Sequence, residues 1–498
     1  MADYYVSPTG DDSRDASGPA QAVRSLTRAM QIIAAAYVAR GNVAVPETVH
    51  VGAGSYSRAG GEAFPITVLP LTTVEGAGRD SCVVEYSPPP DGDFPCGFSD
   101  TVLLVSGTVR RLSVASAFPP DVWYPLMDAR LVDEQAVLEE SSATGIVWVD
   151  AAARLTDVDF GSVYTQDGYE RDGEIFPLIE SCRGTDNSVS PTDGGEDAAF
   201  SIRGGRVERS TGPGFFVRSP GRTVIQNNVV PILKGFWVHR PILDAPPASD
   251  VLTPVIRNNT IQSADVLLDG YAPFSEICVF GESRWESNQL FAQRLVLGCT
   301  AVLSDNVVGA RRVDFNTVGC FWDAIGPGDE IRVNCPVLTG NTFNQYPIGA
   351  MSGGEVDPDR DLGAFLTVTE QAAPVFSGNR VLLSDWGVPN VRTPVAVRTL
   401  QTLPHLWSSA EWIAERIDWA SRVLTSLPEP DFGGGAGGSE GGNLFHAATP
   451  AVAHIKIQVG LGPYQLWARD NVWSSPPDVT ILDGGTEVTC DVEGWSLE

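Results

Sequence analysis

Short runs of alternating apolar and polar residues, broken by Gly and Pro, fill most of the chain between residues 41 and 398. A period of two is typical of β-strands that bury one face. Residues 25–39 instead place apolar side chains on one helical face, with Ser25 as N-cap and Gly41 as stop. Residues 408–427 form a second amphipathic pattern, which Ser408 and Glu411 begin as a capping box. The pattern predicts a β-rich chain with one helix towards each end.

One motif recurs along the β-rich part as TVIQNNVV, PVIRNNTI, SRWESNQL, AVLSDNVV, PVLTGNTF and PVFSGNRV. The sixth residue of each copy is always Asn: Asn228, Asn259, Asn288, Asn306, Asn341 and Asn379. Recurrence within about 20–50 residues predicts a solenoid, and the β-rich copies exclude helical repeats. We expect one asparagine per coil, at a sharp bend where it adopts the left-handed conformation. Its side chain is expected to hydrogen-bond along the stack.

The first 85 residues resemble a known family. The stretches YYVSPTGDD, PAQAVRSLTRAM, VHVGAGSY and LTTVEGAGRDSCVV are similar to the start of parallel β-helix proteins of the pectin-lyase-like superfamily. In particular they resemble an uncharacterised bacterial and archaeal β-helix domain. The resemblance implies an all-β, right-handed, single-stranded parallel β-helix, whose open N-terminal end a strand and a helix cover.

This reading divides the chain into five parts. Residues 1–40 are the N-terminal strand and helix cap, and residues 41–398 are the parallel β-helix. A C-terminal capping helix is expected in residues 399–430. The Gly-rich stretch 431–442 predicts a flexible linker, and residues 443–498 a small β-rich module. Such a module suggests self-association or attachment to a partner protein.

Composition narrows the class of partner. The formal net charge is −29, from 62 acidic and 33 basic residues. Such a surface repels nucleic acid, and no apolar segment reaches the length of a membrane span. Cations would be attracted, with calcium a natural candidate cofactor. Solubility alone is the plainer explanation of the charge.

The eight cysteines include no CxxC pair, which argues against a zinc site. Cys278, Cys299 and Cys320 are 21 residues apart. This spacing would match one short coil, so these thiols are expected to stack inside the solenoid.

The superfamily contains polysaccharide lyases and hydrolases as well as non-catalytic adhesins and structural proteins, so the fold leaves the activity open. The NTD and GHG motifs of the hydrolases are absent, as is the arginine motif of the pectate lyases. The best catalytic constellation is Asp305, Arg311 and Asp314, where carboxylates and an arginine base would suit a lyase. Ordinary ion pairs on a solvated face are the alternative.

Two loops are candidates for calcium. The stretch GTDNSVSPTDGGED supplies the hard oxygens of Asp186, Asn187, Asp193 and Asp197, without the spacing of an EF-hand. The loop TGDDSRDAS, with three aspartates, is similar. Either can also be an ordinary surface insertion.

Four tryptophans near expected coil turns, Trp237, Trp285, Trp322 and Trp386, form a candidate carbohydrate-binding row. Exposed indoles along a solenoid could stack against sugar rings. Packing beneath long loops is the alternative.

We therefore expect a non-catalytic β-helix that binds a polysaccharide or cell-surface glycan or serves as a structural element. A lyase, or secondly a glycoside hydrolase, acting on an acidic polysaccharide is the competing hypothesis. The fold resemblance suggests an extracellular or cell-surface protein. No signal peptide is visible, so cytoplasmic and particle-associated locations stay open.

Overall fold

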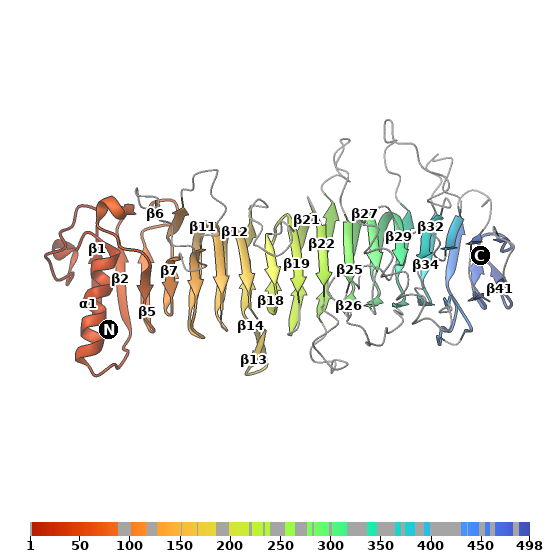
Figure 1. Ribbon diagram of the computed structural model, residues 1–498, viewed down its shortest axis with the longest axis horizontal. Helices are drawn as coiled ribbons and strands as arrows, with labels where there is room; N and C mark the ends of the chain where they lie inside the picture. The colour runs from red at the N-terminus through yellow and green to blue at the C-terminus, as the bar shows by residue number, and fades with distance from the viewer. Residues whose placement is uncertain are drawn as a thin grey trace, which may run out of the picture. The chain divides into compact units, whose positions relative to one another are not determined.

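A computed structural model (Figure 1) describes residues 2–87, 101–116, 127–150, 152–166, 168–185, 199–218, 222–232, 235–239, 254–263, 276–280, 283–297, 301–315, 336–345, 364–369, 374–383, 393–398, 430–435, 437–447, 454–458, 464–481 and 488–498. They form two compact units, and the boundary falls between Pro231 and Ile232. In both units strands pair in parallel with their counterparts one coil further along the chain, which makes each a parallel β-solenoid. The predicted all-β parallel fold is confirmed; the right-handed winding stays a prediction.

Unit 1 has three rows of paired strands. The first row contains β1 (Ala2–Val6), β2 (Glu47–Val51), β5 (Thr72–Gly76), β8 (Thr108–Arg110), β11 (Val137–Val149), β12 (Arg154–Thr165), β15 (Leu178–Glu180), β18 (Gly205–Glu208) and β20 (Thr223–Gln226). The second contains β3 (Gly54–Ser57), β6 (Cys82–Tyr86), β9 (Ser113–Ser116), the middle of β11 and β12, β16 (Arg183–Gly184) and the start of β21 (Val229–Ile232). The third contains β4 (Ile66–Val68), β7 (Thr101–Val105), β10 (Met127–Leu131), the ends of β11 and β12, β17 (Phe200–Ile202) and β19 (Gly214–Arg218). A separate antiparallel hairpin joins β13 (Tyr169–Arg171) to β14 (Glu174–Phe176).

The core of unit 1 follows from strand alternation. Side chains at every second position point inward, and register places them on top of one another from coil to coil. In the first row this column is aliphatic and buried throughout: Val49, Val74, Val109, Leu138, Leu155, Ile179, Val207 and Ile225. The buried face of these strands is therefore a continuous stack of branched aliphatic side chains.

A loop and a helix cover the N-terminal end of unit 1. The loop after β1 pairs with its outer edge, because Ser7 N–H donates to the Val23 carbonyl at 2.9 Å and Val23 N–H donates to the Tyr5 carbonyl at 3.0 Å. The helix α1 (Leu26–Ala39) follows and contacts β1 and β4, the first strands of their rows (Figure 1). Two short 3-10 turns are also present: η1 (Pro19–Gln21) precedes α1 in the sequence and η2 (Arg58–Gly60) follows it.

The start of α1 is held by two carboxylates. The predicted N-cap is confirmed, since Ser25 Oγ accepts the Arg28 N–H at 3.1 Å. Asp12 binds the backbone N–H and hydroxyl of Ser25, each at 3.0 Å. Glu62, 5% exposed, accepts the N–H groups of Leu26 at 2.7 Å and Thr27 at 2.9 Å. These contacts satisfy N–H groups that a helix leaves open at its start.

Unit 2 repeats the three-row arrangement. Its first row contains β23 (Val255–Arg257), β26 (Ser283–Glu286), β28 (Ala301–Ser304), β30 (Val337–Thr339) and β33 (Val375–Ser377). The second contains β24 (Thr260–Ser263), β27 (Gln289–Leu297), β29 (Val307–Phe315), β31 (Thr342–Gln345), β34 (Arg380–Leu383), β36 (Leu444–Ala447), β39 (Val472–Trp473) and β42 (Ser496–Leu497). The third contains β22 (Gly235–His239), β25 (Glu276–Phe280), the ends of β27 and β29, β32 (Ala364–Thr369), β35 (Thr393–Arg398), β37 (Ile455–Gln458) and β40 (Val479–Ile481). A further parallel pair joins β38 (Tyr464–Trp467) to β41 (Val488–Asp491).

An asparagine ladder runs along the bend between the first two rows of unit 2. Each asparagine except the last, Asn471, gives its backbone N–H and its side-chain amide to Oδ1 of the asparagine one coil further on, at 2.8–3.2 Å. All are at most 1% exposed: Asn259, Asn288, Asn306, Asn341, Asn379, Asn443 and Asn471. The predicted stacking is confirmed, because buried amides need partners and the next coil supplies them.

The predicted conformation of these asparagines is wrong by one residue. The left-handed position is the residue just before each ladder asparagine: Asn258, Ser287, Asp305, Gly340, Gly378, Gly442 and Asp470, with φ between 54° and 69°. The chain bends there, and the next side chain turns inward. Asn228 has the same role in unit 1, where its Oδ1 accepts the Ser210 N–H at 2.8 Å.

The predicted linker and separate C-terminal module are also corrected. Asp431 forms parallel bridges to Val375 and Trp467, and Gly441 forms one to Ser377. The glycines between them fold around the fully buried Asp431 carboxylate, which accepts the N–H groups of Gly433, Gly435 and Ser439 at 3.0 Å. β36 then pairs with β34 on one side and β39 on the other. Residues 431–498, where described, therefore continue the solenoid of unit 2.

Other predictions have mixed outcomes. The expected helix at 408–427 lies outside the described residues, as do Cys299 and Cys320. Cys278 pairs in register with Val296, so the neighbouring coil places a valine beside its backbone rather than Cys299. None of the helices described is long and apolar enough to cross a membrane.

Candidate functional site: a groove on the first coils of unit 1

The outward positions of the first row carry polar and aromatic side chains. Register aligns Tyr5 of β1, His50 of β2, Glu75 of β5 and Arg110 of β8. They alternate with the inward aliphatic column, so the same period that builds the core also presents them to solvent. Four residues, the first and last of which are 105 positions apart in the sequence, thus form one line across four successive coils.

Two aromatic rings begin this line. The rings of Tyr5 and His50 lie 5.0 Å apart between centroids, with 30° between their planes. His50 Nε2 lies 3.2 Å from Asp3 Oδ1, so the ring also has an acidic neighbour. Packed rings of this kind offer a rigid surface that combines an apolar face with polar edges.

A carboxylate with two arginines continues it. Arg110 Nη2 donates to Glu75 Oε2 at 2.9 Å, and Arg111 Nη1 lies 3.5 Å from Glu75 Oε1. Arg111 also donates to the Ala77 carbonyl at 3.4 Å. The hydrogen bond from Arg110 lowers the pKa of Glu75, against the opposing effect of burial. Glu75 is therefore held as a carboxylate.

Tyr5, His50, Glu75 and Arg111 border a shallow groove of about 490 Å³ at the bend after the first row. Pro19 and Ala22 of the loop that follows β1 also line it, as do Gly52 and Gly76. A Cβ on Gly76 would lie 2.2 Å from the Arg111 carbonyl oxygen, so only glycine fits at this position. The volume is within the range of ~300–1,000 Å³ that is common for small-molecule sites.

The groove suits a ligand that has both apolar faces and hydroxyl groups. Tyr5 and His50 supply a flat apolar surface, Glu75 supplies acceptors and Arg111 supplies donors. All residues that line the groove are described, and all belong to unit 1. Glu75 is the one carboxylate among the residues that line the groove. A glycosidase needs two carboxyl groups, and such a pair is not found among these lining residues.

The predicted catalytic residues are not brought together. Asp305 is exposed in the left-handed turn before β29, whereas Asp314 is 1% exposed near the end of that strand. The start of β29 pairs with β31 and its end with β32, so the two carboxylates lie on different rows. Arg311 also lies on β29, and its side chain is outside the described part of the structure.

The predicted carbohydrate-binding row of tryptophans is wrong for Trp285. This ring is fully buried, and its indole N–H donates to Ser283 Oγ at 2.9 Å. Register places it between Ile256 and Leu303 in the inward column, so it is a core residue and cannot stack against a sugar. Trp237 lies on β22, with a side chain that is not described. Trp322 and Trp386 fall outside the described residues.

The candidate calcium ligands Asp186, Asn187, Asp193 and Asp197 also fall outside the described residues. In the other candidate loop, Asp12 binds the start of α1, and Asp11 accepts the Ser13 N–H at 2.9 Å. Across the described ranges, no three His, Cys, Asp or Glu side chains are grouped so that they could hold a metal ion.

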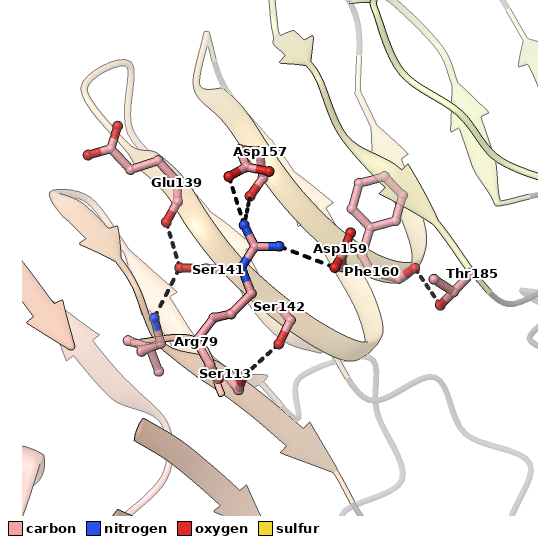
Figure 2. A network of polar contacts seen from close by, with 10 residues as sticks. Arg79, Ser113, Glu139, Ser141, Ser142, Asp157, Asp159, Phe160 and Thr185 are labelled. Atoms are coloured by element: carbon pink, nitrogen blue, oxygen red, sulfur yellow. Dashed lines mark hydrogen bonds and ion pairs between the residues drawn. The ribbon is translucent and has the colours of Figure 1, made fainter. Parts of the chain in front are cut away.

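A second polar cluster in unit 1 centres on Arg79 (Figure 2). Its guanidinium binds Asp157 Oδ2 at 2.7 Å and Asp159 Oδ2 at 3.2 Å, while the Arg79 carbonyl accepts the Ser113 hydroxyl. The two carboxylates raise the pKa of Arg79 although burial opposes this. Both aspartates are committed to one arginine that lies 78 and 80 residues earlier. We interpret this cluster as a clamp between coils.

Asp128 is a buried acid that belongs to neither cluster. Asp128 on β10 is fully buried and accepts the Gly145 N–H at 2.6 Å where the register between β10 and β11 shifts. Burial raises its pKa to about 6, against the lowering effect of hydrogen bonds from Gly145, Ser116 and Thr144.

Comparison with known proteins does not assign the chain to a family. No family model matches the chain, and no curated protein or solved structure is significantly similar to it. The interpretation of the groove therefore rests on its own geometry.

The sequence patterns did not single out Tyr5, His50, Glu75 or Arg111. The available signal was alternation, because YYV, VHV and VEG each place one polar or aromatic residue between inward side chains. The coil lengths that bring these segments into register could not be read from the sequence, since the asparagine motif begins only at residue 223.

Proposed function

We propose that the protein is a non-catalytic β-solenoid that binds carbohydrate in the groove on its first coils. The observation that carries this proposal is the packed, tilted ring pair of Tyr5 and His50 beside the Glu75–Arg111 pair in an open groove. A sugar ring has an apolar face of C–H groups and a rim of hydroxyls. The rings would contact the face, and the charged pair would bind the rim.

The parallel solenoid is compatible with the pectin-lyase-like superfamily, whose resemblance motivates an extracellular or cell-surface location. We place the binding function on the N-terminal groove rather than on residues 443–498. The attachment role expected for those residues depended on a separate module, and their described strands belong to the solenoid of unit 2.

A binding screen tests this proposal. The full chain is incubated with immobilised neutral and acidic oligosaccharides, with calcium and with chelator, and binding is measured together with release of products. We expect binding without new reducing ends or unsaturated products. Tyr5→Ala should weaken it about tenfold, the effect of losing roughly 1.4 kcal/mol of ring contact.

Two further variants distinguish a loss of ligand contacts from a loss of folding. Arg111→Gln changes an exposed side chain and should weaken binding while leaving the far-ultraviolet circular dichroism unchanged. Tyr37→Ala removes a half-buried tyrosine of α1 outside the groove and should leave binding intact. Binding that survives both Tyr5→Ala and Arg111→Gln would overturn the assignment of the groove. Product release would show a lyase or hydrolase instead of a non-catalytic protein.

A further inference from the structure

Glu75 shares its carboxylate between two arginines. Oε2 takes Arg110 at 2.9 Å and Oε1 takes Arg111 at 3.5 Å, so each guanidinium has a negative partner. Arg110 has a second acidic neighbour, because its Nη1 lies 3.9 Å from Glu139 Oε1. The Glu75 side chain is 22% exposed, less than either arginine. The Glu75 carboxylate therefore lies between the two guanidinium groups. It competes with any ligand for their N–H groups.

This arrangement leaves the groove without an uncompensated positive charge. Among the residues that line it, Glu75 and Arg111 carry opposite charges, and His50 already faces the Asp3 carboxylate. An acidic saccharide would have to compete with Glu75 for Arg111. It would also approach a chain of net charge −29, which repels anions at long range.

An uncharged saccharide meets no such competition. Its hydroxyls can donate to Glu75 and accept from the remaining N–H groups of Arg111 without separating the pair, because a carboxylate and a guanidinium each have more hydrogen-bonding positions than one contact uses. We propose that Glu75 is a specificity-determining residue, which makes the groove select uncharged saccharides over uronate-containing ones. This inference rests on the proposed function, and it adds the class of ligand.

The ionisation of Glu75 supports the role. Its pKa is lowered, chiefly by the hydrogen bond from Arg110, so the carboxylate stays charged across the neutral range.

The test exchanges this one charge. Binding of a neutral galactose oligomer and of a galacturonate oligomer of equal length is measured at low and high salt for the wild type, Glu75→Gln and Glu139→Gln. The wild type should prefer the neutral oligomer, with little effect of salt. Glu75→Gln should bind the galacturonate oligomer about tenfold more tightly than the wild type does, as expected for one gained charge-assisted hydrogen bond. High salt should remove that gain.

Glu139→Gln is the matched control, because it removes the same charge from the same outward line but outside the groove. It should leave the preference unchanged. Arg111→Gln combined with Glu75→Gln should cancel the gain, which ties it to the freed guanidinium. An equal gain in Glu139→Gln, or none in a folded Glu75→Gln, would overturn the role of Glu75. A wild type that binds neither oligomer, nor any neutral sugar of the wider screen, would instead count against the proposed function itself.

Discussion

Asn306 holds Asn341 of the next coil through two hydrogen bonds to one oxygen. Its backbone N–H and its side-chain amide both donate to Asn341 Oδ1 at 2.9 Å. The same amide donates to the Trp285 carbonyl at 2.9 Å, and Asn306 Oδ1 in turn accepts both donors of Asn288. One side chain therefore connects three successive coils of unit 2 in a place that water does not reach.

Asn306→Ala should destabilise unit 2 by about 3 kcal/mol, because it leaves the buried donors of Asn288 without an acceptor. The expected readouts are a lower midpoint of chemical denaturation and faster hydrogen exchange at the Asn288 amide. Ser304→Ala, two residues earlier on β28, should change neither by much. Equal effects of the two variants would argue against the ladder as a source of stability.

Glu62 should stabilise the start of α1. Glu62→Gln leaves one carbonyl oxygen for the two N–H groups of Leu26 and Thr27 that the carboxylate now binds. It also removes a negative charge from a helix N-terminus, so we expect a loss of about 1–2 kcal/mol. Hydrogen exchange at the amides of residues 26 and 27 measures this locally. Glu85→Gln, an exposed change on β6, is the control; if it accelerated exchange there as much, the assignment to Glu62 would be wrong.

Asp128 should make unit 1 less stable as pH rises. Its pKa of about 6 in the folded chain lies above the ordinary value of 3.8, so the folded state holds the proton more tightly than the unfolded state. The stabilising contribution is complete below about pH 3.8 and is lost as pH rises through about 6, a change of roughly 3 kcal/mol.

The Asp128→Asn variant keeps an acceptor for the Gly145 N–H and cannot ionise. Its denaturation midpoint should therefore depend less on pH between 4 and 7 than that of the wild type. Asp172→Asn, on the exposed turn between β13 and β14, serves as the matched change and should follow the wild type. Parallel pH profiles for all three proteins would contradict the assignment.

The Arg79 clamp should contribute little, and salt should weaken it. The side chains of Arg79, Asp157 and Asp159 are 26%, 56% and 41% exposed, so water screens the ion pairs. We expect Arg79→Ala to cost about 1 kcal/mol at low salt, and its difference from the wild type to vanish near 1 M salt. Arg183→Ala is the control, because it removes the same charge from an exposed position of β16. A large loss that salt does not change would mean that Arg79 acts through packing instead.

Local sequence patterns were sufficient for the repeat. Alternation identified strands, and the spacing of Asn259, Asn288, Asn306 and Asn341 equals the coil spacing of the ladder, 29, 18 and 35 residues. The N-cap at Ser25 was equally readable, because it depends on neighbours within one helical turn. Each of these signals is local, so no knowledge of distant contacts was needed.

Local sequence patterns gave a wrong prediction where contacts between residues far apart in the sequence determine the structure. A glycine-rich stretch is flexible when isolated, yet here the Asp431 carboxylate binds three of its N–H groups and fixes it within a coil. That misreading concealed Asn443 and Asn471, although ARDNVW repeats the asparagine motif.

The sequence by itself determined the parallel β-solenoid and its asparagine ladder, since both follow from short-range periodicity and from the need of buried amides for partners. Only the tertiary structure decided the groove. Tyr5, His50, Glu75 and Arg111 come from four coils of unequal length, and nothing in the sequence specifies which residues of those coils lie side by side. Backbone pairing between coils sets that register, and the register places two rings beside one charged pair.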